Sequence, residues 1–176
     1  MKKLFSILII MLLLTSCSPI GSAMMPRFDE HKAVASTIDK LSKAINSHNE
    51  AELKGLFSKS IYNINRFDES INYLFEYIEG DIISSDIDPG IGVRHERSEG
   101  KSKIITNVTY SIKTDTQEYL VAFKECVVND FKPYEVGIFS FYIINILNYT
   151  GGDYTYGGDG DWSPGIHYEK NYKYEL

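Results

Sequence analysis

The sequence predicts an α+β protein in which N-terminal helices pack on one face of an antiparallel sheet. Between residues 29 and 80, apolar residues recur with the 3.6-residue period of amphipathic helices. Beyond residue 81 the period changes, and apolar and polar residues alternate as they do in half-buried strands. Helices that precede a run of strands, rather than alternating with them, are typical of α+β proteins.

Three helices are expected in the first half of the chain. The first, residues 29–47, places four aliphatic side chains on one stripe: Val34, Ile38, Leu41 and Ile45. Asn49, with Glu52 three residues later, resembles a capping box and predicts a second, shorter helix. A third helix is expected after a cap at Asn65, and it should end at Gly80, because glycine commonly terminates helices.

Five strands are expected in the second half, separated by turns such as the one at residues 88–90. Their ranges are 81–85, 91–97, 103–113, 117–128 and 134–147. The last range is apolar on both faces, as in a central strand that is covered on both sides. The same pattern would suit a homodimer formed through the face of the sheet, so the sequence leaves both arrangements open.

The N-terminus has the features of a targeting signal. Lys2 and Lys3 precede an apolar run at residues 4–14 that is too short to span a bilayer. Residues 14–17 (LTSC) resemble the lipobox of bacterial lipoproteins, which implies cleavage after Ser16 and a lipid on Cys17. An ordinary secretory peptide cut near residues 21–23 is the alternative. The lipobox implies a lipid-anchored protein on the extracytoplasmic face of the cell membrane, or of an outer membrane in a host that has one.

Length and charge restrict the domain organisation and the partners. The 176 residues divide into a signal peptide (1–16), a lipidated cysteine and tether (17–27), one domain (28–168) and a tail (169–176). The net charge of −6 becomes more negative once Lys2 and Lys3 are removed. This charge argues against a nucleic-acid partner, because phosphate contacts need clustered lysine and arginine.

Several segments resemble known families. A helix, the segment 46–57 (NSHNEAELKGLF), another helix and long strands resemble the nuclear-transport-factor-two-like superfamily, whose members wrap a curved antiparallel sheet around a helix to form a cone. The lipobox, residues 79–84 (EGDIIS) and residues 158–166 (GDGDWSPGI) look like a clostridial-type lipoprotein family of unknown function. The resemblance implies a cavity between helices and sheet, and it assigns no catalytic residues.

The expected function is a non-catalytic module that binds a small ligand or glycan in that cavity. Tyr110, Tyr142 and Trp162 are the candidate ligand-binding residues, since aromatic rings suit such sites. One alternative is a protein-interaction or immunity-type accessory module. The other is a cavity enzyme of isomerase or dehydratase type, for which Asp81 and Tyr62 are the candidate acid–base pair.

No metal or cofactor site is predicted. Three aspartates among glycines could suit calcium, but the closing glutamate of an EF-hand is missing, so they are interpreted as turn residues: Asp153, Asp159 and Asp161. The four histidines are scattered and offer no zinc spacing. With Cys17 acylated, Cys126 has no disulfide partner and is expected to be a small buried side chain in a strand. Tyrosines crowd the C-terminal quarter, which fits either an aromatic binding surface or the packing of a final strand.

Overall fold

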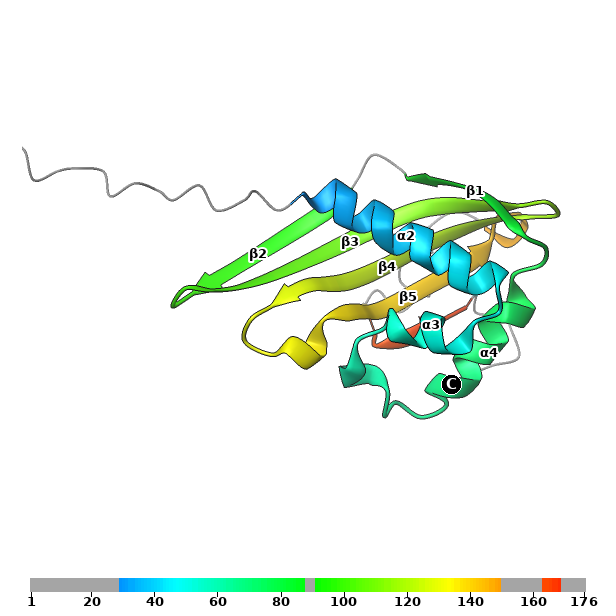
Figure 1. Ribbon diagram of the computed structural model, residues 1–176. Helices are drawn as coiled ribbons and strands as arrows, with labels where there is room; N and C mark the ends of the chain where they lie inside the picture. Colours follow the sequence, from blue (N-terminus) through cyan, green and yellow to red (C-terminus); the bar gives the residue numbers. More distant parts are fainter. Residues whose placement is uncertain (1–28, 88–90, 150–162, 169–176) are drawn as a thin grey trace, which may run out of the picture.

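The computed structural model describes residues 29–87, 91–149 and 163–168, and Figure 1 shows how their helices and strands are arranged. The helices are α2 (Glu30–Asn46), α3 (Glu50–Gly55) and α4 (Phe67–Tyr77). The strands are β1 (Ile82–Ile87), β2 (Gly92–Ser98), β3 (Lys101–Thr114), β4 (Glu118–Asn129), β5 (Gly137–Asn145) and β6 (Gly165–His167). Short 3-10 helices lie at η1 (Lys59–Ile61), η2 (Pro133–Glu135) and η3 (Ile146–Asn148).

The first two helices begin where their capping residues predict. The Asp29 side chain accepts a hydrogen bond from the Lys32 N–H at 3.0 Å, which starts α2. Asn49 caps α3 in the same way through the Glu52 N–H, at 3.1 Å. The expected cap at Asn65 is wrong, because α4 begins at Phe67 after Arg66, which has a left-handed φ of 63° and no capping side chain.

The strands form one sheet in the order β1-β3-β4-β5-β6. Neighbouring strands are antiparallel except β5 and β6, which are parallel. Both β1 and β2 pair with β3, on the edge that β4 leaves free. The β2 pairing covers the first half of β3, up to Asn107, and the β1 pairing covers its second half, from Tyr110.

The expected fold class, N-terminal helices packed on a curved antiparallel sheet in a nuclear-transport-factor-two-like cone, is wrong. The sheet dominates the described residues: it has six strands, with 14 residues in β3 and 12 in β4, against helices of 17, 6 and 11 residues. The segment 46–57, on which the resemblance rested, is mostly a turn and this short helix. Local periodicity indicates where helices form, but the extent of a sheet depends on long-range pairing, such as that of β1 and β2 with one strand.

The hydrophobic core contains side chains from all three helices and from one face of the sheet. Figure 1 shows α2 lying across β3 and β4. Its predicted stripe is buried, as are the alternate residues Val108, Tyr110 and Ile112 of β3. Strand β5 lies between β4 and β6, so it is an interior strand as predicted, although it is shorter than the predicted range 134–147. Within the described ranges, no helix is long and apolar enough to cross a membrane.

Candidate functional site

The candidate acid–base pair forms no shared site. The Tyr62 hydroxyl donates to the Lys54 carbonyl oxygen at 2.8 Å, and its ring stacks on Phe67 with 5.7 Å between centroids. Asp81 is exposed, and its backbone exchanges hydrogen bonds with Asp115 at 3.1 and 3.2 Å. Each residue is therefore engaged in its own local structure, which does not support acid–base chemistry between them.

The candidate ligand-binding tyrosines lie on opposite faces of the sheet. Tyr110 pairs with Val121 and faces the core, where its ring meets Phe123 edge-on at 5.9 Å. Burial raises the pKa of the Tyr110 phenol. Tyr142 pairs with Ala122, so its side chain points to the other face, because neighbouring residues of a strand alternate. The two tyrosines cannot line one cavity between the helices and the sheet.

Tyr142 is held by the last described segment of the chain. Its ring stacks on His167 with 4.4 Å between centroids, and its hydroxyl oxygen accepts the Ser163 N–H at 3.1 Å. The third candidate, Trp162, lies outside the described residues, as does Cys17.

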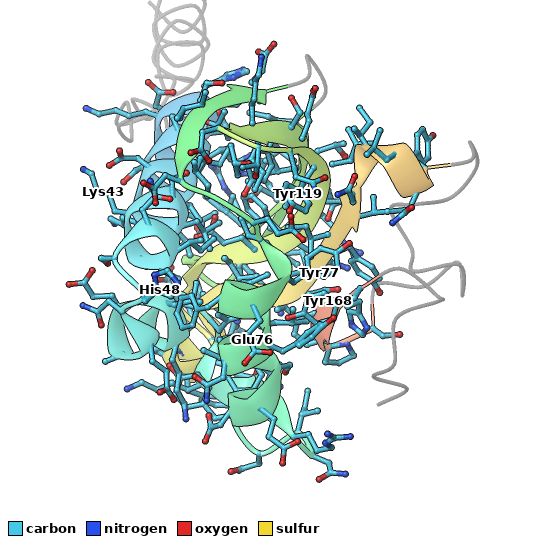
Figure 2. All side chains as sticks on the ribbon, turned by 90° about the vertical axis from the view of Figure 1, so that its right-hand side faces the viewer. Lys43, His48, Glu76, Tyr77, Tyr119 and Tyr168 are labelled. Atoms are coloured by element: carbon cyan, nitrogen blue, oxygen red, sulfur yellow. The ribbon has the colours of Figure 1, made fainter. Side chains whose placement is uncertain are left out.

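Of the C-terminal tyrosines, the structure describes Tyr168. Figure 2 shows it beside Tyr77, and the ring centroids of the two tyrosines are 5.1 Å apart. The Tyr168 hydroxyl donates to the Ser70 carbonyl oxygen at 2.7 Å. Burial, and to a lesser degree the charge of Tyr77, raises the pKa of Tyr168. This tyrosine packs the last described segment, residues 163–168, against α4, which favours the packing alternative for this residue.

The connection from β4 to β5 exposes three large apolar side chains. In this β4–β5 loop, defined as residues 130–136, the exposed fractions are 42% for Phe131, 53% for Tyr134 and 42% for Val136. The Lys101 ammonium lies 5.8 Å from the centre of the Phe131 ring and adds a positive charge beside it. Exposed aromatic side chains on a loop are typical of binding surfaces.

Ion pairs and an amide hold this loop in one conformation. The Glu135 carboxylate accepts hydrogen bonds from Lys103 at 2.9 Å, Lys132 at 3.0 Å and the Asn129 amide at 2.9 Å. The Asn129 side-chain oxygen accepts the N–H groups of Phe131 and Lys132 at 3.1 and 2.9 Å. Hydrogen bonds from Lys103 and Lys132 lower the pKa of Glu135.

The far end of the loop is fixed by a close backbone approach. The Ile138 N–H donates to the Leu56 carbonyl at 2.9 Å, and the Ser58 N–H donates to the Ile138 carbonyl at 2.8 Å. Ser58 also donates through its hydroxyl to the Tyr134 carbonyl at 3.2 Å. Gly137 has a φ of +118°, and a Cβ there would lie 2.7 Å from the Ser58 nitrogen. The loop is therefore anchored at both ends.

A buried carboxylate lies on the face of the sheet that α2 covers. Glu125 of β4 accepts a hydrogen bond from the Thr37 hydroxyl of α2 at 3.0 Å through Oε1. Burial raises the pKa of Glu125, while the Thr37 hydrogen bond and the charge of Lys40 lower it. Irregularities in the register with β3 and β5 occur on either side of this position, and such bulges often re-aim a side chain.

Two patterns in the sequence bear on the buried Glu125 and on the β4–β5 loop. Tyr119, Val121 and Phe123 predict the buried face of β4, and Glu125 is the next residue on that face, an acid in an apolar series. In the loop, residues 129–133 were interpreted only as a turn, and Tyr134 as the start of a strand. Asn129 and Pro133 are turn-forming residues that predict a loop at this point, but nothing in the sequence indicates that its aromatic side chains are exposed.

The structure tests the prediction for Cys126, and it tests the prediction on metal sites within the described residues. Cys126 is a buried free thiol in β4, which confirms its predicted environment, and burial raises the pKa of the thiol. Among residues 29–87, 91–149 and 163–168, no group of three or more His, Cys, Asp or Glu side chains could hold a metal ion. The aspartates at 153, 159 and 161 lie outside these ranges.

Comparison with known proteins shows the family. Residues 40–146 match the model of a family described as a domain of unknown function, DUF5104. A comparison with curated proteins found no match. The matched region covers more than half of the chain and includes both Glu125 and the β4–β5 loop. The chain therefore belongs to the DUF5104 family, an uncharacterised family of proteins.

Proposed function

We propose that this protein is a lipoprotein, anchored through lipidated Cys17 to the extracytoplasmic face of the cell membrane, that acts as a non-catalytic protein-binding module. The lipobox at residues 14–17 supports the anchor. The β4–β5 loop supports protein binding. Its three exposed apolar side chains are the observation on which the proposal rests.

The loop suits protein binding because its conformation is set before a partner arrives. A binding surface that is already ordered loses less conformational entropy on association. Large aromatic side chains such as Phe131 and Tyr134 supply most of the energy at many interfaces. The partner that fits is a protein with an apolar surface and a carboxylate placed to meet Lys101, which lies beside the Phe131 ring.

The other functions expected from the sequence have less support. The small-ligand or glycan site was expected to contain Tyr110 and Tyr142, which lie on opposite faces of the sheet. The isomerase or dehydratase was expected to use Asp81 and Tyr62, whose hydrogen bonds go to separate partners. A homodimer would be a special case of protein binding, with a second copy as the partner.

The proposal predicts that a loop variant loses its partner. In detergent extracts of the cells that naturally make the protein, we expect a protein to co-purify with the wild-type chain in a fixed ratio. The double variant Phe131→Ala/Tyr134→Ala should reduce its recovery at least tenfold, since each lost aromatic anchor costs about 2 kcal/mol of binding. Quantitative mass spectrometry of the purified material measures this ratio.

The matched control is Ile83→Ala, because Ile83 is 62% exposed on β1 and lies outside the loop. It should leave recovery of the partner unchanged. Recovery that is equal in the loop variant and the control would contradict the proposal. A small-mass adduct in native mass spectra of the purified chain, with no protein partner, would favour the small-ligand function instead.

A further inference from the structure

Two polar contacts connect the N-terminal half of α2 to the sheet. At the start of the helix, Glu30 Oε1 lies 3.2 Å from His95 Nε2 of β2. Two helical turns later, Thr37 donates to Glu125 of β4. The helix thus meets two different strands through one histidine–carboxylate pair and one buried carboxyl group.

The surroundings of Glu125 disfavour its charge. Its side chain is 9% exposed, and its second oxygen, Oε2, has no hydrogen-bond partner among the described residues. Thr106 lies directly opposite on β3, fully buried, and its hydroxyl is also without a partner among those residues. A protonated Glu125 can keep the Thr37 hydrogen bond at Oε1, and it no longer leaves a negative charge on the unpartnered Oε2.

Few charged groups on the neighbouring elements favour the ionised form of Glu125. From α2, the charge of Lys40 acts on Glu125 and favours the ionised form. The neighbours across the sheet are Thr106 and Ile138, which do not ionise, and Cys126 follows on the same strand. The buried carboxylate therefore has weak compensation for lost hydration.

The charged groups near His95 come from α2 and from β2 itself. Glu30 faces it from α2, and Ile104 is its neighbour on β3. On β2 itself, Arg94 and Glu96 form their own ion pair at 3.1 Å. The contact between Glu30 and His95 is therefore separate from the ion pair of the two residues that flank His95.

We propose that the N-terminal half of α2 is an acid-tightened clamp, which binds the sheet more firmly when Glu125 takes up a proton. In acid the buried charge at Glu125 disappears while its hydrogen bond to Thr37 is kept. At higher pH the Glu125 carboxylate favours hydration over packing against α2. A protein outside the cytoplasm would meet the pH of its surroundings; only this last point rests on the proposed function.

Hydrogen exchange tests the clamp. The chain from residue 17 onward, with Cys17→Ser, retains every described residue, and exchange is followed at pH 4.5 and 7.5 after correction for the intrinsic rates. For backbone amides 34–41 of α2, we expect about tenfold more protection at pH 4.5 than at pH 7.5, because the pKa of Glu125 is raised from its ordinary value of 4.5. Glu125→Gln should give high protection at both pH values, because it removes the charge and keeps the shape.

Two further variants make the outcome specific. Thr37→Val removes the donor to Glu125 and should enlarge the pH dependence, whereas Glu96→Gln, the control on β2, should preserve it. Equal protection of α2 at both pH values in the wild-type chain would overturn the clamp. So would a Glu125→Gln chain that retains the full pH dependence.

Discussion

Replacing Gly137 with alanine is expected to lower the free energy of unfolding by about 3 kcal/mol, through backbone strain and overpacking together. The glycine has a φ of +118°, a conformation that side chains strongly disfavour. A Cβ would also lie 2.7 to 2.9 Å from backbone atoms of Leu56, Phe57 and Ser58. Backbone atoms cannot rotate away, so relief requires separating this segment from β5. Urea denaturation followed by circular dichroism measures the change.

Alanine variants at two other glycines separate the backbone strain from the overpacking. Gly165 has a similar φ of +115°, but the nearest atom to its Cβ position is 3.9 Å away, so Gly165→Ala reports strain alone. Gly55 in α3 has a negative φ and open space around it, and Gly55→Ala should be neutral or stabilising by up to about 1 kcal/mol. A Gly137→Ala chain as stable as Gly55→Ala would refute the close approach that anchors the β4–β5 loop.

Replacing Cys17 with alanine is expected to abolish lipid attachment completely. In the proposed lipobox the thiol is the group that would be acylated, and no other residue of residues 14–17 offers one. The wild-type chain should begin at Cys17 and carry acyl chains, whereas the variant should carry none and should not be cut after Ser16. Labelling with a fatty-acid analogue and mass spectrometry of the N-terminus measure both effects.

The second cysteine provides the control for this experiment. Cys126 is buried in β4, so Cys126→Ala should keep the label in full. A wild-type chain without acyl label, or one cut near residues 21–23, would contradict the lipoprotein assignment and favour an ordinary secretory peptide.

Local features of the fold were predictable because they depend on neighbours in the sequence. The stripe of Val34, Ile38 and Leu41 identifies α2, and the cap at Asn49 identifies the start of α3. The long alternating segments correspond closely to β3 and β4. Each of these signals depends on residues a few positions apart, where propensity and periodicity apply.

Features that depend on distant contacts were not predictable in the same way. The sequence does not indicate that β1 and β2 share one edge of β3, or that β6 adds in parallel to β5. The register of the strands decides which face of the sheet a side chain occupies. Tyr110 pairs with Val121 of β4, and Tyr142 pairs with the next residue, Ala122. Because adjacent residues of a strand point to opposite faces, the two tyrosines lie on opposite faces of the sheet.

The candidate surfaces differ in how far the sequence reveals them. Glu125 interrupts an apolar series, so its burial was visible in principle. The exposure of Phe131 and Tyr134 was not, because it results from Glu135 binding Lys103 of another strand and from the approach of Ser58 to the loop. An aromatic residue in a sequence is as easily assigned to a core as to a surface.

The most direct test of protein binding by the loop is photo-crosslinking in the cells that naturally make the protein. A photoreactive phenylalanine analogue at position 131 should capture one discrete partner protein, and the same analogue at position 83 on β1 should not. Both positions are exposed, and position 83 is the more exposed of the two, so a lack of capture there would not result from burial. No protein adduct at position 131, or the same adducts at both positions, would contradict the account.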